Sequence, residues 1–223
     1  TFIEDNAVPV ESLARFVREL RAVIHAAGTR AAFWAHASVG VLHVRPLLNP
    51  HDERDLAILR DIAVKAADLA RDCGGVMSGE HGDGKVRGPL LRRFFGDELA
   101  GPGGAFAQVK ALFDPRGLLN PGNIVGAGDV ASITQRTRIT PRTPAVVPGV
   151  DTYYDYRDQT DFAHAVEMCN GAGVCRKSSG GTMCPSYRAT LDERHSTRGR
   201  GNALRLAITG QSAERGDAAG PAW

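Results

Sequence analysis

Residues 31–47 read AAFWAHASVGVLHVRPL. Two short extended runs, Ala31 to His36 and Val41 to Leu47, flank a tight polar turn at Val39-Gly40. Apolar, aromatic and β-branched side chains favour strands, and a short turn between two such runs is typical of an antiparallel hairpin. The stretch therefore predicts a hairpin that forms part of a small antiparallel sheet.

Helices are predicted on both sides of the hairpin. Val10 to Ala27 is amphipathic, with apolar residues at helical spacing. A long helix follows the hairpin, with Asn49-Pro50 as cap and first-turn proline and with Gly74-Gly75 at its end. Two further helices are expected before Asp114-Pro115. This order predicts an α+β fold with helices packed on one face of the sheet.

Composition and charge exclude some partners. The 223 residues contain 27 basic and 25 acidic side chains, a net charge of +2, which is no nucleic-acid signature. No apolar run is long enough for a transmembrane segment, and the N-terminus has no secretory signal. We expect a cytoplasmic protein, with peripheral attachment to the inner face of a membrane left open. No methionine opens the sequence, so we expect a piece of a larger protein.

A linker separates two ordered regions. We predict a first domain over residues 1–125, a linker over 126–160 and a second, mainly helical domain over 161–223. The linker begins with a stretch rich in glycine, proline, threonine and arginine that has no sustained periodicity. In the second domain, a short helix is expected from Asp161 to Met168, and Ser196-Thr197 is expected to cap another.

Two histidines of the hairpin are candidate metal ligands. Pairing about the Val39-Gly40 turn places His36 directly opposite His43 on one face of the sheet. Directly opposed side chains have Cβ atoms about 4.5–5.5 Å apart, close enough for both imidazoles to reach one divalent ion. The pattern alone leaves two interpretations open, a surface or interface pair of histidines and a metal site.

A third ligand must come from another segment, and Glu80 is the candidate. A short extended run, 76–78, leads into the glycine-rich turn 79–84, which reads GEHGDG. Glycines let a backbone approach a ligand closely, so Glu80 supplies a carboxylate while its neighbour His81 is left as a base. Glycine-rich turns also arise for backbone reasons alone, and the pattern does not decide between the two explanations.

Three motifs follow one another in a fixed order. They are His36-x6-His43, the run SGEHGDG at 78–84, and the run FDPRGLLNPG at 113–122. Together they resemble the C-terminal half of FAD-linked oxidases of the vanillyl-alcohol-oxidase type, over roughly Val10 to Val125. This group holds D-lactate dehydrogenases, glycolate oxidase flavin subunits and D-2-hydroxyglutarate dehydrogenases. The resemblance implies a ferredoxin-like domain that contributes to the binding of substrate and metal.

The resemblance also implies a role for individual residues. By position, His36, His43 and Glu80 hold a divalent metal, zinc or manganese. His81 contacts the substrate and accepts its hydroxyl proton, and Asn120 lies in the segment that packs near the flavin ring. The implied reaction is the oxidation of a D-2-hydroxy acid, in which the proton goes to His81 and the hydride to FAD.

Two positions depart from the family pattern. Residues 38–41 read SVGV where the family commonly has a Gly-Asp-Gly-Asn run, and Arg45 replaces a common asparagine. Arg45 either clamps a substrate carboxylate bidentately or shields the edge of the strand. The departures leave the identity of the substrate open.

The cysteines fall into two groups. Cys73 lies on the apolar stripe of the long helix, which indicates a structural role. Cys169, Cys175 and Cys184, the last followed by Pro185, form a compact glycine-rich stretch. Their spacing departs from the usual C-x2-C-x2-C-x3-C-P of ferredoxins, so by spacing alone a structural zinc site or unpaired thiols compete with an iron–sulfur cluster.

The residues around these cysteines, 162–177, 181–187 and 196–200, look like the junction in large fused flavin and iron–sulfur dehydrogenases. This likeness implies the start of a 4Fe-4S ferredoxin-type domain that passes electrons to a quinone or a carrier protein. Three cysteines cannot complete an all-cysteine four-iron site. We therefore expect this piece, which also lacks a flavin-binding portion, to be inactive alone.

The leading hypothesis is thus an FAD-dependent D-2-hydroxy-acid dehydrogenase. The alternative from another class is a non-catalytic electron-transfer or scaffold subunit that keeps an oxidase-like domain. A zinc hydrolase, which needs no flavin, is a third interpretation.

Overall fold

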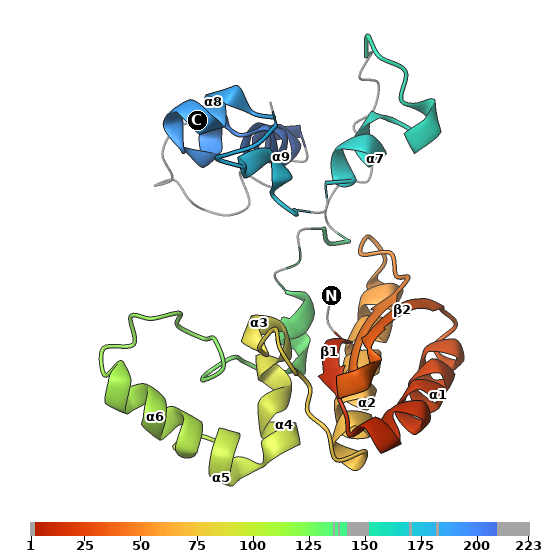
Figure 1. Ribbon diagram of the computed structural model, residues 1–223, viewed down its shortest axis with the longest axis vertical. Helices are drawn as coiled ribbons and strands as arrows, with labels where there is room; N and C mark the ends of the chain where they lie inside the picture. The colour runs from red at the N-terminus through yellow and green to blue at the C-terminus, as the bar shows by residue number, and fades with distance from the viewer. Residues whose placement is uncertain are drawn as a thin grey trace. The chain divides into compact units, whose positions relative to one another are not determined.

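The computed structural model of the chain contains two compact units, Thr1–Pro141 and Arg142–Trp223 (Figure 1). It describes residues 3–135, 137, 139–141, 152–169, 171–181 and 183–208. Unit 1 holds a sheet and the candidate metal ligands, and unit 2 holds the three clustered cysteines.

The sheet of unit 1 has three antiparallel strands in the order β1-β3-β2. They are β1 (Ile3–Ala7), β2 (Ala31–His36) and β3 (Val41–Pro46). β2 and β3 confirm the predicted hairpin, whereas sequence reasoning missed β1. Since both outer strands are antiparallel to β3, they run parallel to each other, and helix α1 (Val10–Ala26) connects them. This is the split β-α-β arrangement of ferredoxin-like folds.

The segment after helix α2 (Glu53–Asp72) supplies only a trace of a fourth strand. Val76 and Ala7 form an isolated antiparallel bridge, in which each backbone amide donates to the carbonyl of the other at 2.7–3.1 Å. The predicted extended run 76–78 is thus reduced to one bridge. Its effect is to tie the outer edge of β1 to the start of the glycine-rich loop.

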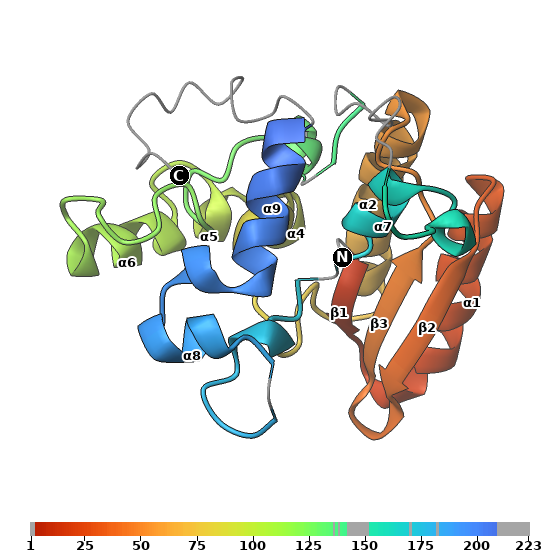
Figure 2. The same ribbon diagram turned by 90° about the horizontal axis from the view of Figure 1, so that it is seen from above.

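Helices α1 and α2 cover one face of the sheet, as predicted from the sequence (Figure 2). Phe16, Leu20 and Ile24 repeat every four residues along α1 and are buried at 0–1% exposure. They pack in one cluster with Leu42 and Val44 of β3 and with the alanine-rich inner side of α2. Burying a side chain of this size contributes about 1.5–3 kcal/mol, so this layer dominates the stability of unit 1.

The start of α2 differs from the prediction. Its N-cap is Asp52, whose side chain accepts a hydrogen bond from the amide of Arg54 at 2.8 Å. The predicted cap at Asn49-Pro50 is wrong, because Asn49 closes a turn before the helix: its side-chain oxygen accepts from the amide of His51 and its carbonyl from that of Asp52. Helix α2 therefore begins one turn later, with acidic residues in its first turn as the helix dipole favours.

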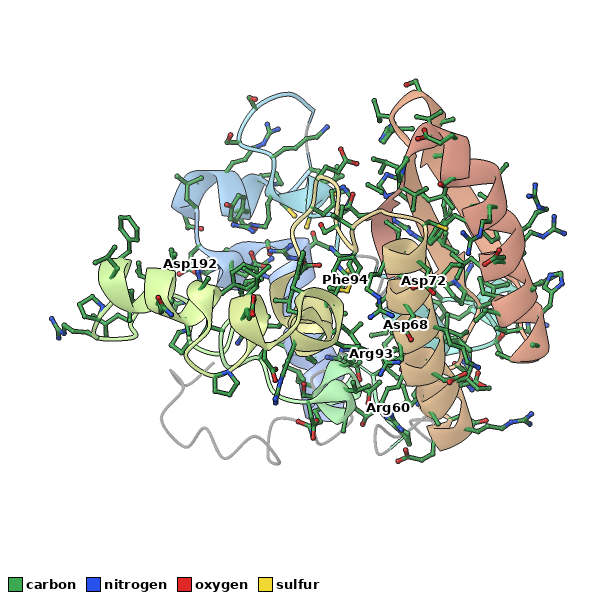
Figure 3. The ribbon with its side chains drawn as sticks, turned by 90° about the horizontal axis from the view of Figure 1, so that it is seen from below. Arg60, Asp68, Asp72, Arg93, Phe94 and Asp192 are labelled. Atoms are coloured by element: carbon green, nitrogen blue, oxygen red, sulfur yellow. The ribbon has the colours of Figure 1, made fainter. Side chains whose placement is uncertain are left out.

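Residues 84–113 form more and shorter helices than the two predicted. They are α3 (Gly84–Arg87), η2 (Gly88–Leu90), α4 (Leu91–Phe95), α5 (Asp97–Ala100) and α6 (Ala105–Phe113). Gly96, in a left-handed conformation with φ +79°, separates α4 from α5, which is why one continuous helix does not form. Arg93 fixes α4 against α2 through a bidentate pair with Asp68 at 2.7 Å (Figure 3).

Part of the predicted linker packs on unit 1. Val130–Thr134 forms the short 3₁₀-helix η3, and its Ile133 is buried in the core cluster of α1, α2 and the sheet. Arg60 of α2 donates a hydrogen bond at 2.6 Å to the hydroxyl of Thr134. This segment is therefore attached to unit 1 and does not act as a tether.

The described part of unit 2 is built from short helices. They are η4 (Arg157–Gln159), α7 (Phe162–Glu167), η5 (Val174–Arg176), α8 (Pro185–Thr190), η6 (Glu193–His195) and α9 (Thr197–Ile208). The predicted cap of α9 is confirmed, since the Ser196 hydroxyl accepts from the amide of Gly199 at 2.9 Å. Across the residues described in both units, no helix has the length and apolar character needed to cross a membrane.

Candidate active site

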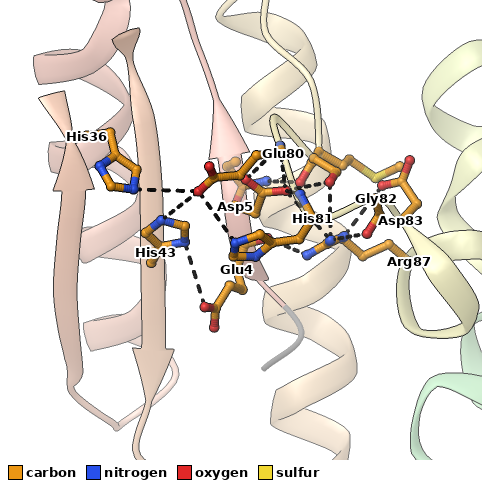
Figure 4. A network of polar contacts seen from close by, with 12 residues as sticks. Glu4, Asp5, His36, His43, Glu80, His81, Gly82, Asp83 and Arg87 are labelled. Carbon is orange, nitrogen blue, oxygen red and sulfur yellow. Dashed lines mark hydrogen bonds and ion pairs between the residues drawn. The ribbon is translucent and has the colours of Figure 1, made fainter. Parts of the chain in front are cut away.

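A cluster of polar side chains lies on the sheet face that α1 and α2 leave uncovered (Figure 4). His36 comes from the end of β2, His43 from β3, and Glu80 and His81 from the loop that follows the bridge at Val76. The side chain of His43 is 13% exposed, whereas those of His36, Glu80 and His81 are 45–60% exposed. The cluster therefore has a buried inner end and an outer side open to solvent.

The strand register differs from the one predicted. His43 pairs with Trp34, and His36 pairs with Val41, so the two histidines are diagonal neighbours instead of direct partners. The connection is a 3₁₀ turn, η1 (Ala37–Val39), followed by Gly40. A shift of two residues keeps the same side-chain parity, so both imidazoles still share one face. Their ring centroids are 5.3 Å apart.

The carboxylate of Glu80 is the centre of the cluster. Its Oε1 lies 3.3 Å from Nε2 of His43, 3.6 Å from Nε2 of His36 and 3.4 Å from Nε2 of His81. The ring of His81 also stacks on that of His43, with centroids 5.2 Å apart. The structure thus brings together all four residues predicted as metal ligands or base.

The loop that carries Glu80 and His81 is fastened to β1 by Asp5, a residue that sequence reasoning missed. The Asp5 carboxylate accepts from the Ser78 hydroxyl at 2.5 Å and from the amides of Glu80 at 3.0 Å and His81 at 2.7 Å. Burial acts to raise the pKa of Asp5, but the bonds from Ser78, His81 and Glu80 outweigh it and lower the pKa. Asp5 is therefore held as a carboxylate.

Arg87 fastens the same loop from its other side. Its guanidinium donates to the carbonyls of Glu4 and Gly82 and, at 3.3 Å, to the hydroxyl of Ser78. Asp83 lies 3.4 Å from the Arg87 Nε, and burial raises the pKa of the Asp83 carboxyl even though Arg87 opposes that shift. The loop is thus fixed by a buried polar network, not by its own glycines.

The arrangement of donor atoms fits a divalent cation. Ligand atoms about 2.0–2.2 Å from a tetrahedral zinc ion lie about 3.3–3.6 Å apart. The two contacts of the Glu80 Oε1 with His43 and His36, at 3.3 and 3.6 Å, are close to that separation. By distance alone His81 fits equally well, and one ligand atom each of Asp5, His43, Glu80 and His81 lie within 4.8 Å of one another, a set that does not include His36. We prefer the hairpin histidines to Asp5, because the Asp5 oxygens already accept bonds from three donors.

Glu4 stands behind His43, opposite the cluster. Its Oε1 is 3.7 Å from Nδ1 of His43, which is too long for a hydrogen bond but has the direction in which a carboxylate orients a ligating imidazole. Glu4 is also bonded by Arg45 at 3.2–3.3 Å, and the Arg45 guanidinium stacks over Trp34. Arg45 is thus anchored on the same sheet face as His43.

Asn120 lies in a turn that Asp114 organises. Asp114 accepts from the amides of Leu118 and Leu119 and from Lys110, and the Lys110 and backbone bonds lower its pKa to about 2. Asn120 itself has φ +46° and lines a cavity of about 480 Å³ beside α6. The side of this cavity formed by Phe113 is largely exposed.

The cysteines differ in environment. All four lie among the described residues, and none forms a disulfide. Cys73 is buried in the core of unit 1, and burial raises its pKa, as a structural thiol requires. In unit 2 the Cys184 sulfur meets the hydroxyl of Thr197 at 2.7 Å and its amide at 3.1 Å. These bonds, together with weaker contributions that include Cys175, lower the pKa of Cys184 and favour its thiolate.

Comparison with known proteins agrees with this fold. The family described as FAD linked oxidases, C-terminal domain, matches residues 1–124 of the chain. That range includes the sheet, both hairpin histidines, the loop of Glu80 and His81, and the turn of Asn120.

Longer matches extend into unit 2. The chain is 35% identical over 215 residues to a D-2-hydroxyglutarate dehydrogenase of Pseudomonas putida, and 34% identical over 206 residues to one of Escherichia coli. These cover 95% and 92% of the chain but only 20% and 19% of the relatives, so the chain spans about a fifth of their length. A D-lactate dehydrogenase of Archaeoglobus fulgidus is 32% identical over 121 residues, which are 54% of the chain and 26% of that protein.

Proposed function

The chain belongs to the family of FAD-linked oxidases, C-terminal domain, and on that premise we propose that its parent protein oxidises a D-2-hydroxy acid to the 2-oxo acid. The observation that supports this proposal most directly is the convergence of three imidazoles on one carboxylate oxygen, all at 3.3–3.6 Å. Such a set can supply the ligands of a divalent cation and, in addition, a base. Oxidation of a hydroxyl group uses the cation to lower the pKa of the hydroxyl and the base to accept its proton.

The extent of the matches supports one substrate class over another. The two D-2-hydroxyglutarate dehydrogenases match 92–95% of the chain, including the cysteine stretch, whereas the D-lactate dehydrogenase matches 54%. We therefore propose D-2-hydroxyglutarate, or a hydroxy acid with a similar second carboxylate, as the substrate. Arg45 would bind that carboxylate. Glu4 accepts bonds from its Nε and Nη2, and because a guanidinium has five N–H groups, others are left to donate to a substrate.

Within the site, we assign the metal-binding role to His36, His43 and Glu80, and the base to His81. When bound, the cation supplies charge that lowers the pKa of the substrate hydroxyl, and FAD accepts the hydride. His81 takes the hydroxyl proton on its Nε2, the nitrogen that faces the cluster. Its neighbour His43 is too buried to serve as an exchangeable base, whereas the half-exposed His81 ring can pass the proton to water.

We further propose that unit 2 begins an electron path. Cys169, Cys175 and Cys184 would contribute ligands to a 4Fe-4S cluster, because cluster ligands are thiolates and the bonds from Thr197 lower the pKa of Cys184. Electrons would then pass to a quinone or a carrier protein in the cytoplasm or at the inner face of a membrane. Asn120 would lie near the flavin, at the rim of the cavity beside α6.

A screen on the full-length protein tests the activity. D-2-hydroxyglutarate, D-lactate and glycolate are offered with an artificial electron acceptor, and zinc and manganese are measured by mass spectrometry. We expect the highest kcat/KM for D-2-hydroxyglutarate. The variant His43→Ala should lose metal and turnover together, whereas His25→Ala, at the exposed end of α1, should lose neither.

The result that contradicts the proposal is equally concrete. Full turnover by metal-free protein, or a His43→Ala variant that keeps its metal, would remove the role assigned to the cluster. The electron path is tested separately by iron and labile-sulfide content in Cys184→Ser, with Cys73→Ala as the control that should keep both.

A further inference from the structure

Asp5 occupies an irregular position in β1. Glu4 pairs with His43 and Asn6 pairs with Leu42, so Asp5 is the extra residue of a β-bulge and has no partner on β3. Its φ is +77°, a left-handed conformation that residues other than glycine rarely adopt. Bulges beside active sites serve to redirect a side chain, and strained residues persist where the surroundings hold them in place.

The bulge turns the Asp5 side chain into the interior, toward the loop 78–83. The residue is 0% exposed. Its carboxylate accepts from Ser78 and from the amides of both Glu80 and His81, while its own carbonyl accepts from the amide of Gly79 at 2.8 Å. One residue of β1 therefore engages four consecutive residues of the loop.

The loop also packs so closely on β1 that Gly79 has no room for a side chain. A Cβ atom at Gly79 would come within 2.9 Å of the Cβ of Ala7 and 3.5 Å of the Asp5 carboxylate. Arg87 closes the other side by bonding the carbonyls of Glu4 and Gly82. The Glu80 and His81 side chains thus extend from a backbone that Asp5 holds in place.

We propose that Asp5 is a positioning residue that sets the placement of both Glu80 and His81 in the active site, through the bulge that aims its carboxylate at their amides. The inference rests on the proposed function for the roles of those two residues. It assigns no contact with substrate to Asp5, which acts only through the loop. An asparagine at this position keeps the shape but offers a single acceptor oxygen to three donors, and its amide group would face N–H groups.

The test uses the full-length protein and the isosteric variant Asp5→Asn. Zn²⁺ affinity is measured by competition with a chelator, kcat and KM with D-2-hydroxyglutarate, and the fold by circular dichroism. We expect Zn²⁺ affinity and kcat to fall by about 10–100-fold, as is typical when a group that orients a ligand is lost, with KM changing less. The control Asp61→Asn makes the same chemical change in an exposed ion pair with Lys65 and should alter neither quantity.

A milder variant covers the case in which Asp5→Asn does not fold. Ser78→Ala removes one of the bonds to Asp5 and also the longer bond from Arg87. It should lower Zn²⁺ affinity and kcat at least about fivefold, the effect of one hydrogen bond. Folded Asp5→Asn or Ser78→Ala protein with wild-type affinity and kcat would overturn the positioning role, since a merely structural contact lowers stability alone. Wild-type protein that binds no metal and oxidises no hydroxy acid would overturn the proposed function instead.

Discussion

Gly40, which ends the turn between β2 and β3, is a position where one added methyl group should disturb the hairpin that carries His36 and His43. Its φ is +70°, and its carbonyl accepts from the amide of Val8 at 3.0 Å. A Cβ atom there would lie 1.9 Å from the carbonyl oxygen of Val8. The variant Gly40→Ala therefore forces β1 away from the hairpin, or the turn out of its conformation.

The cost has two parts that can be separated. A left-handed alanine costs about 1–2 kcal/mol. The Val8 carbonyl must also retreat by roughly 1.5 Å to reach an ordinary contact, and overpacking of this kind costs about 1–3 kcal/mol. Gly28 supplies the matched control, because its φ is +79° and a Cβ there meets nothing within 4 Å. Gly28→Ala should therefore show the first cost alone.

Urea unfolding followed by circular dichroism, together with hydrogen exchange at the Val8 amide, measures both variants. We expect Gly40→Ala to lose about 2–5 kcal/mol of unfolding free energy and Gly28→Ala about 1–2 kcal/mol. Val8 should exchange faster only in Gly40→Ala. Equal losses in the two variants, with Val8 protected in both, would refute the claim that close contact with β1 restricts this turn.

Two further outcomes follow from the titrating groups. The bonds that Asp114 accepts lower its folded pKa to about 2 from an ordinary 3.8, so they stabilise the turn at 114–119 above pH 4 and are lost as the pH falls through about 2. The protection of the Leu119 amide, relative to its intrinsic exchange rate, should fall over that window, and Asp114→Asn should show little protection at any pH. Cys73 is buried, which raises its pKa, whereas Cys169 is exposed. A thiol reagent at pH 7 should therefore label Cys169 in cluster-free protein long before Cys73. Rapid labelling of Cys73 would show that the core of unit 1 opens.

The shared face of His36 and His43 could be predicted from the sequence, although their register could not. The parity of side chains along a strand survives a shift of two residues, so the predicted face holds even though the turn takes up two more residues than expected. The exact register depends on η1 and on the fit of Gly40 against Val8, which is a tertiary contact. A sequence pattern contains no information about that contact.

β1 and its bulge illustrate the opposite case. Residues 3–7 read IEDNA, and acidic residues and asparagine disfavour strands, so no local signal marks this segment. The strand exists because Ile3 packs in the core and because Asp5 and Asn6 find partners in the loop 76–81. The only trace in the sequence is the adjacent pair Glu4-Asp5 beside apolar residues. Buried acidic groups need partners, and those partners are known only once the chain is folded.

The proposed metal ligands come from segments that are far apart in the chain: a hairpin supplies two imidazoles, and a loop beyond the whole of α2 supplies the carboxylate. An unfolded chain does not hold these groups together, so a cation that binds them binds the native state alone. Cation concentration then becomes a thermodynamic variable of folding, and a hundredfold excess over the dissociation constant adds about 2.7 kcal/mol to the free energy of unfolding. If the proposed ligands hold zinc, thermal stability measured against added zinc titrates that site.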